Sequence, residues 1–241
     1  MTNRVADRAA SERFYAAVLS TLGINKSSSA GEFDEWDDFS VAAANERHPA
    51  TRRVHIGFVA PSPAHVDEFW RAGTAAGYRD DGAPGPRPEY GVSYYGAFLL
   101  DPDGNSAEAV RHDELRRGGS VDHVWMRVAD LGLAREFYEL VGRHAGFRLD
   151  RDLPGRAQFA GASGSFSVLR GPPSEHAHLA FPVGEDAEVD EFHRALIAAG
   201  HRDNGAPGLR PQYHEGYYAA FVLDPDGNNI ELVNHNRDST A

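Results

Sequence analysis

Three polar side chains that lie far apart in the sequence have the types needed to bind a divalent metal ion: His123, His178 and Glu231. Each lies in a stretch of alternating polar and apolar residues, which is typical of a β-strand with one buried face. A carboxylate in such a strand is costly to bury without a cationic partner. Two histidines and one carboxylate suit Fe(II), Mn(II), Ni(II) or Zn(II) and leave positions open for a substrate. If a cupped sheet brings these strands together, we expect one divalent metal ion in the C-terminal half of the chain.

The carboxylate lies in a stretch, residues 217–233, that predicts a hairpin. Two apolar runs flank the segment Asp224-Pro225-Asp226-Gly227-Asn228. The proline fixes φ and the glycine permits a positive φ, so a tight turn joins two strands. Alternation then places Glu231 on the face opposite Ile230 and Leu232. A solvated glutamate on an edge strand is the alternative for this residue taken alone.

The chain repeats itself at an interval of 123 positions. The segment Asp101-Pro102-Asp103-Gly104-Asn105 returns as residues 224–228, and His55 and Glu108 return as His178 and Glu231. A match this long at a fixed interval indicates gene duplication. We therefore expect two domains, residues 1–115 and 120–241, joined near Arg116-Arg117-Gly118-Gly119.

The second copy shows the order of elements in each domain. Alternation predicts strands over residues 121–129 and 176–183, and apolar spacing predicts helices over 131–144 and 187–199. Residues 159–169 indicate a short pair of strands, and residues 200–203 a turn into the next segment. The result is a strand–helix–strands unit twice per copy, and four such units in the chain.

The first copy lacks part of the predicted metal site. The counterpart of His123 would precede Met1, and Gly91 stands where the second copy has His214. We expect this copy to have a truncated first strand and to bind metal poorly or serve a structural role. A start codon further upstream is the alternative, and a neighbouring chain could fill the gap in the sheet.

The overall composition limits the classes of function. The 241 residues include 24 basic and 36 acidic residues, for a net charge of -12, which opposes nucleic acid or an anionic membrane as a partner. The chain has no cysteine, and twelve histidines are available as metal ligands. Without a leader or a long apolar run, we expect a cytoplasmic protein, a monomer or homodimer, that acts on a small molecule.

The four units, the D-P-D-G-N-x-I-E hairpin and the strand histidines resemble the vicinal oxygen chelate superfamily, which includes glyoxalase I, extradiol dioxygenases and bleomycin-resistance proteins. The resemblance covers nearly the whole chain. It implies an α+β fold in which four βαβββ units form two glyoxalase-like cupped-sheet domains in tandem. It also implies that the metal ligands are His123, His178 and Glu231. The segment from Arg210 to Phe221 is similar to bacterial glyoxalase-like proteins.

Two departures from the family narrow the expected reaction. The resemblance to glyoxalase I implies a site with four ligands, one of them a second glutamate. The strand that would carry this glutamate offers only Ser165, Ser167 and Leu169 here. In the extradiol pattern a tyrosine takes part in ring cleavage, and Phe221 stands at that position. Phenylalanine cannot donate a proton.

Further residues are predicted to complete the site. We expect His214 to act as acid or base with Tyr217 and Tyr218, and the substrate to contact Arg210, Tyr213, Trp125 and Phe221. The predicted function is a metal-dependent enzyme of the dioxygenase or lyase/isomerase type, acting on a small substrate with adjacent oxygens. The alternative is a metal-free binding protein of the antibiotic-resistance type. A relic in which both copies are inert is a third reading.

Overall fold

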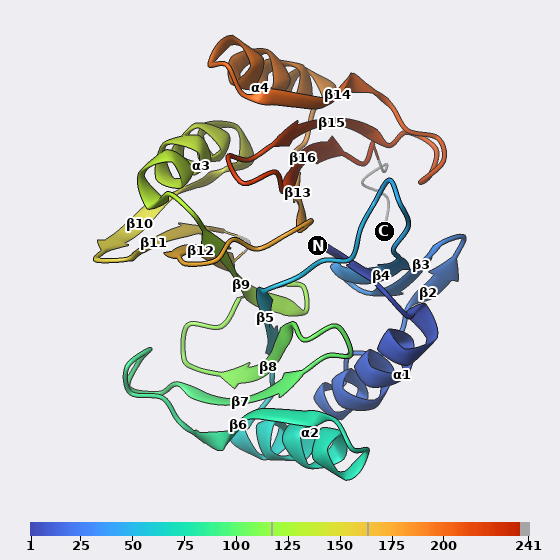
Figure 1. The fold of residues 1–241 in the computed structure, drawn as a ribbon, viewed down its shortest axis with the longest axis vertical. Coiled ribbons are helices and arrows are strands. Elements are labelled where there is room, and N and C mark those ends of the chain that lie inside the picture. Colours follow the sequence, from blue (N-terminus) through green and yellow to red (C-terminus); the bar gives the residue numbers. More distant parts are fainter. Residues whose placement is uncertain (117, 163, 237–241) are drawn as a thin grey trace.

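A computed structural model describes residues 1–116, 118–162 and 164–236 of the chain. Arg117 of the predicted linker and residues 237–241 of the second copy lie outside these ranges. The chain folds into four consecutive βαβββ units, as predicted (Figure 1). The first unit comprises β1 (Thr2–Val5), α1 (Arg8–Leu19), a 3-10 turn η1 (Ser20–Leu22), β2 (Ser28–Ala30), β3 (Phe33–Trp36) and β4 (Phe39–Ala43). The second comprises β5 (Val54–Val59), α2 (Pro63–Ala75), β6 (Arg79–Pro86), β7 (Tyr95–Leu100) and β8 (Ser106–Arg111).

The third and fourth units repeat this order. The third comprises β9 (Val121–Val128), α3 (Leu131–Ala145), β10 (Phe147–Leu153), β11 (Arg156–Gly161) and β12 (Gly164–Arg170). The fourth comprises β13 (His178–Pro182), α4 (Asp186–Ala198), β14 (Arg202–Leu209), β15 (Tyr218–Leu223) and β16 (Asn229–Asn234). Strand β10 is an element that sequence alternation missed, because most of its side chains are exposed and it contains charged residues on both faces. The hairpin over residues 217–233 forms as predicted.

The four units pair into two eight-stranded sheets, and each sheet combines units from both predicted domains. One sheet has the order β10-β11-β12-β9-β5-β8-β7-β6 and joins the second unit to the third. The other has the order β14-β15-β16-β13-β1-β4-β3-β2 and joins the first unit to the fourth. We call them the inner-unit sheet and the outer-unit sheet. Each sheet therefore combines one half of each sequence copy, and residues 1–115 and 120–241 do not each close a sheet of their own.

The two sheets differ at the seam between their units. In the inner-unit sheet β5 and β9 pair antiparallel over most of β5, with His55 opposite Trp125 and Gly57 opposite His123. In the outer-unit sheet β1 and β13 share a single pair, Thr2 with His178. Strand β1, with four residues, is also shorter than β9, with eight. The inner-unit seam therefore has the more extensive backbone pairing.

The helices cover the outer faces of the sheets and leave the concave faces free for a site (Figure 1). Helix α3 shows why such a segment folds: Asp130 caps its first turn by accepting hydrogen bonds from the N–H groups of Gly132 and Leu133. Gly146 ends it in the left-handed conformation. Its apolar stripe, which includes Phe137, Tyr138 and Val141, is fully buried against the sheet.

The repeated turn segment forms a buried polar hub in both copies. The Asp224 carboxylate accepts hydrogen bonds from the N–H groups of Asp226 and Asn228 at 2.9 and 2.8 Å, and from the hydroxyl of Tyr138 at 2.9 Å. Asp101 has the same partners in its own copy, including Tyr15 at 2.9 Å. Because a buried carboxylate must be hydrogen bonded, this hub explains why the turn has the same residues twice.

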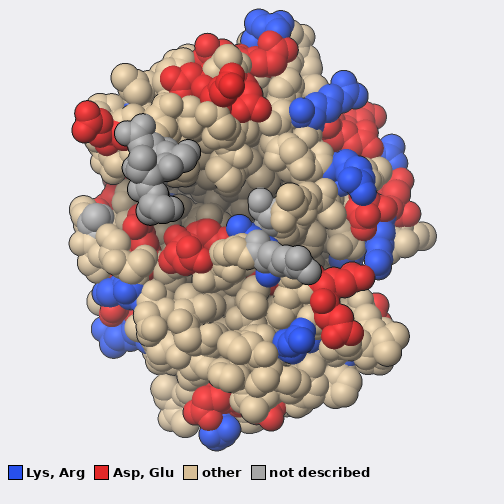
Figure 2. All heavy atoms as spheres, turned by 180° about the vertical axis from the view of Figure 1, so that it is seen from behind, with Lys and Arg blue, Asp and Glu red and all other residues tan. Residues whose placement is uncertain are grey.

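The chain as a whole is acidic, with a net charge of -12. On the face seen in Figure 2, basic side chains are interspersed with acidic ones. Among the described helices, none is both long and apolar enough to cross a membrane.

Candidate metal site

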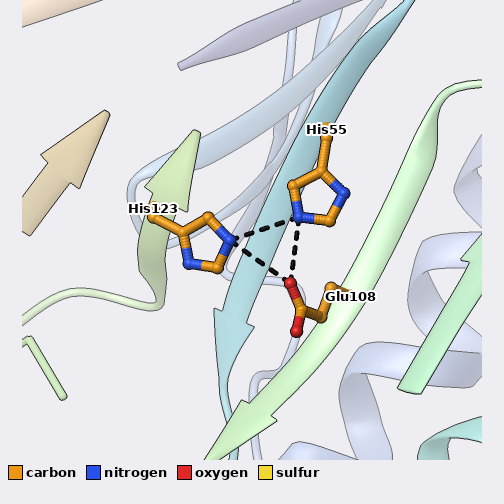
Figure 3. Close-up of side chains that lie close together, drawn as sticks. All are labelled: His55, Glu108 and His123. Atoms are coloured by element: carbon orange, nitrogen blue, oxygen red, sulfur yellow. Dashed lines mark hydrogen bonds and ion pairs between the residues drawn. The ribbon is translucent and has the colours of Figure 1, made fainter. Parts of the chain in front are cut away.

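Two histidines and a glutamate converge on the concave face of the inner-unit sheet (Figure 3). The Nε2 atom of His55 lies 2.9 Å from Oε2 of Glu108, and Nε2 of His123 lies 3.2 Å from the same oxygen. The two Nε2 atoms are 3.2 Å apart. Glu108 and His123 are buried, and His55 is half-buried. The three donor atoms thus form a compact triangle, which we call the inner-unit triad.

Strand register places these side chains. Gly57 on β5 pairs with Glu108 on β8 and with His123 on β9, so the three positions lie side by side across the sheet. His55 precedes Gly57 by two residues and shares its face. A Cβ atom at residue 57 would lie 2.3 Å from Cε1 of His123, so the imidazole ring occupies the space that only glycine leaves.

Hydrogen bonds on the far side of each ring orient the histidines. The Nδ1 atom of His55 lies 3.1 Å from the hydroxyl of Ser106, which in turn donates to Asp81 at 2.8 Å. The Nδ1 atom of His123 lies 2.9 Å from Oδ2 of Asp122. With the proton on Nδ1 in both rings, both Nε2 lone pairs point into the triad, which is the arrangement that metal-binding histidines use.

The carboxylates around the triad are also held by neighbours. The hydroxyl of Tyr94 donates to Oε1 of Glu108 at 2.8 Å, which leaves Oε2 directed at the two histidines. Burial and the charge of Glu108 raise the pKa of Tyr94, so this hydroxyl stays protonated and remains a donor. His112 lies 3.1 Å from Asp122 and stacks on the ring of Tyr94.

Without a metal ion, the triad holds a proton instead. Burial opposes charge on His123, but its hydrogen bonds with Asp122 and Glu108 and the charges of both carboxylates outweigh burial and raise its pKa to about 9. Burial would raise the pKa of Glu108, but its contacts with His123 and His55 lower it to about 2. Burial lowers the pKa of His55, so this ring stays neutral. The metal-free triad is therefore a neutral histidine, a histidinium and a carboxylate.

The triad has the size that a divalent metal requires. With metal–ligand bonds of about 2.1 Å, donors on one face of an octahedron stand about 3.0 Å apart, and donors of a tetrahedron about 3.4 Å. The two observed edges of 3.2 Å lie between these values, and the third, at 2.9 Å, is close to the octahedral value. Two lone pairs and a carboxylate aimed at one point repel one another unless a cation or a proton lies between them. The donor set and its spacing therefore fit a divalent ion.

The predicted trio of His123, His178 and Glu231 is corrected by this geometry. His178 and Glu231 lie on β13 and β16 of the outer-unit sheet, with Nε2 and Oε2 2.7 Å apart. His123 lies on β9 of the inner-unit sheet, with residues of the first copy. The copy that we expected to bind metal poorly therefore supplies two of the three triad residues, and the site lies between the copies rather than within the C-terminal one.

Most of the other predicted site residues line the outer-unit sheet. Tyr217 donates to Oε1 of Glu231 at 2.6 Å, and His214 lies 3.0 Å from Nδ1 of His235. Tyr213 packs on Tyr217, and Phe221 on His178. Of the predicted substrate contacts, Trp125 alone lies beside the triad, with its ring 5.1 Å from that of His55 and 5.6 Å from that of His123.

Two residues that were predicted to act at the site, Tyr218 and Arg210, make their contacts elsewhere. The hydroxyl of Tyr218 points away from the concave face and donates to Asp190 on α4 at 2.8 Å. The guanidinium group of Arg210 lies over Phe221 and donates to the carbonyl oxygens of Ala206 and Leu209. Arg87 makes the same contacts in the other sheet, over Phe98. This recurrence indicates that both arginines brace a loop.

The sheet with the complete triad differs from the other sheet by having glycine in place of alanine at two corresponding positions. Gly57 corresponds to Ala180 at the repeat interval, and Gly96 corresponds to Ala219. A Cβ atom at residue 96 would lie 2.5 Å from Oε1 of Glu108. The inner-unit sheet therefore has glycine at two positions where the outer-unit sheet has alanine, and this difference in the sequence was a signal that pointed to the crowded site.

Substituting Gly57 by alanine tests whether metal binding needs the space that this glycine leaves for the ring of His123. The new Cβ atom displaces the ring of His123, and we expect the affinity for Zn(II) or Co(II) to fall at least about tenfold. The matched control is Ala180→Gly at the corresponding position of the other sheet, which should leave the affinity unchanged. Titration of metal-free protein against a competing chelator measures both. Wild-type affinity in Gly57→Ala would show that the ring of His123 does not bind the ion.

Comparison with known proteins agrees with the fold. The family model of the Glyoxalase/Bleomycin resistance protein/Dioxygenase superfamily matches residues 2–109 and again residues 120–232. The chain therefore belongs to this superfamily, as a tandem member with two matched segments. No protein of curated function matches the chain.

Solved structures support the same assignment of the fold. Glyoxalase I from Zea mays is 19% identical, with a TM-score of 0.69, over 97% of this chain and 90% of the maize protein. A glyoxalase/bleomycin resistance protein from Albidiferax ferrireducens T118 is 28% identical, with a TM-score of 0.42, over 47% of this chain and 96% of its own. The likeness to the maize protein shows that nearly the whole chain shares its fold.

Proposed function

We propose that the protein is a metal-dependent enzyme that acts on a small substrate with two adjacent oxygen atoms. The single observation that supports this most is the inner-unit triad, whose three donor atoms lie 2.9 to 3.2 Å apart. His55, Glu108 and His123 would hold the ion and leave positions open on the concave side. When bound, a divalent ion supplies Lewis-acid polarisation of the substrate oxygens.

The walls beside the triad suit an apolar or planar substrate body. Trp125 contacts both histidines, Phe98 lies 5.8 Å from the ring of His55, and Tyr90 packs edge-on against Trp125. These rings would hold the substrate body and exclude water, while Tyr94 keeps the carboxylate of Glu108 in place. With an ion bound, both histidines would be neutral, with Nε2 directed at the ion and the Nδ1 protons donated to Ser106 and Asp122.

Of the two predicted reaction types, the lyase/isomerase type is favoured. Phe98 of the inner-unit sheet corresponds to Phe221 at the repeat interval, and neither side chain can donate a proton to a ring-cleavage intermediate. Ser167 pairs with Trp125 in the strand register and offers a hydroxyl rather than a second carboxylate as a fourth ligand. We therefore propose a three-ligand site that stabilises an enolate, without the second glutamate of glyoxalase I.

Binding of matched diols to the Co(II)-loaded protein tests the proposal. Catechol, with adjacent oxygens, should change the visible Co(II) spectrum, whereas resorcinol, with the oxygens one carbon further apart, should not. The readout is ligand binding at the ion and does not require the natural substrate. Absence of a stoichiometric metal, or an unchanged spectrum with catechol, would contradict the proposal and favour the metal-free binding protein.

A further inference from the structure

Arg156, at the start of β11, is a half-buried cation on the concave face of the inner-unit sheet. Its guanidinium carbon lies 4.6 Å over the ring of Trp125, the indole that also contacts the histidines of the triad. Stacking on an indole holds a guanidinium group in a fixed plane. The charge of Arg156 is thereby presented beside the proposed metal position.

The hydrogen-bond partners of Arg156 are neutral. Its Nε atom donates to the hydroxyl of Ser167 at 3.1 Å, and Nη2 donates to the amide oxygen of Gln158 at 3.1 Å. Among the described residues, no carboxylate lies within ion-pair distance of this side chain, whereas Arg8, Arg116 and Arg135 each have one. A buried charge is normally paired, so the cup contains a cation whose counter-ion the folded chain does not supply.

The surroundings make an anionic partner more favourable still. Burial lowers the pKa of Arg156, Tyr90 raises it by less than burial lowers it, and the nearby charge of Arg151 lowers it. An added negative charge beside the guanidinium group would favour its charged form. Arg156 donates from Nε and Nη2 to neutral partners, and its remaining N–H groups can bind a planar anion with two oxygens.

We infer that the substrate carries a carboxylate in addition to its two adjacent oxygens, and that Arg156 binds this carboxylate while the triad holds the metal that binds the oxygens. The inference rests on the proposed function and names its substrate class. The body of such a substrate lies along the indole of Trp125, with the anionic group at one end and the chelating oxygens at the other. Arg156 is a specificity residue in this arrangement, and the triad does not depend on it.

Two matched probes test this assignment on the Co(II)-loaded full-length protein. 3,4-Dihydroxybenzoate and 3,4-dihydroxybenzamide both carry the catechol oxygens, but only the first has a carboxylate. We expect the visible Co(II) spectrum to report binding of the acid about tenfold or more tighter than of the amide. In Arg156→Gln this preference should disappear, while the affinity for catechol itself and the metal content stay unchanged. Arg148→Gln, at an exposed position of β10, is the control and should keep the preference.

The outcomes separate the inference from the proposed function. An acid preference that survives in Arg156→Gln, or equal binding of acid and amide by the wild type, overturns the role of Arg156 and leaves the metal-dependent enzyme standing. An unchanged Co(II) spectrum with catechol, the acid and the amide alike overturns the proposed function, and this inference with it. If Arg156→Gln is impaired in folding, Arg156→Lys replaces it in the test. Lysine keeps the charge without the planar fork, so the preference of this variant for the acid should be intermediate.

Discussion

Replacing His123 by alanine should abolish metal binding, whereas replacing His178 by alanine should leave it intact. His123 supplies one of three donor atoms that lie within 3.2 Å of one another. His178 has one carboxylate neighbour, Glu231, and lies in the other sheet. Loss of an outer partner of a metal ligand costs about 10- to 100-fold in affinity, and loss of a ligand itself should exceed that. Elemental analysis of protein purified without chelators, followed by titration with Zn(II), measures the difference.

The pair of variants is matched, because both residues are strand histidines hydrogen bonded to a buried glutamate. Glu108→Gln and Glu231→Gln form a second pair with the same expectation. Metal lost from His178→Ala and retained in His123→Ala would restore the trio that the sequence predicted. Metal reduced by half in each variant would indicate two separate sites, one per sheet, and would contradict the assignment of a single inner-unit triad.

Sequence alternation predicted correctly which face of each strand carries the polar groups. Glu231 lies opposite Ile230 and Leu232, which are fully buried in the core, and its carboxylate meets His178 on the concave face. The period of two fixes this result within one strand, because neighbouring side chains must point to opposite sides. The repeated hairpin was predictable for a similar reason, since its turn residues determine the local backbone.

Alternation could not predict which units share a sheet. A strand exposes the same N–H and C=O groups to any neighbour, so the local sequence does not say whether β9 pairs with β5 or with a strand of its own copy. The duplication favoured the prediction that His123 meets His178 and Glu231, because the interval of 123 relates His55 to His178. The interval does not show that His55 and His123 lie in neighbouring strands. The missing information is the close approach of β5 to β9, and the glycine at position 57, which leaves room for the ring of His123, records it in the sequence.

The affinity for a divalent metal should rise with pH between about 6.5 and 9 and level off above that range. In the metal-free protein, the carboxylates of Asp122 and Glu108 hold the pKa of His123 at about 9, against an ordinary value of 6.5. The ion must displace this proton, so one proton is released for each ion bound and the affinity increases about tenfold per pH unit. Calorimetric titrations in buffers of different ionisation enthalpy measure both the affinity and the released proton.

The thermal stability of the chelated protein should follow the opposite trend over the same range. A histidine whose pKa is raised on folding contributes stability that is complete below pH 6.5 and is lost as the pH rises through 9. His55, whose pKa is lowered by burial, removes stability as the pH falls below 6.5, and Glu108 contributes stability that is lost as the pH falls from 4.5 through 2. The contribution of the triad is therefore greatest near pH 6.5 without metal, and the gain in melting temperature on adding Zn(II) should grow from pH 6.5 to 9.

Asp122→Asn provides the control, because the amide keeps the acceptor for the N–H of Arg116 but removes a negative charge from beside His123. The pKa of His123 should fall in this variant, so the affinity should level off at a lower pH than in the wild type. An affinity that is independent of pH in both proteins would mean that His123 carries no proton in the metal-free state. Since the raised pKa and the metal site depend on the same contacts of His123 with Glu108 and Asp122, that result would also remove the electrostatic argument for the triad.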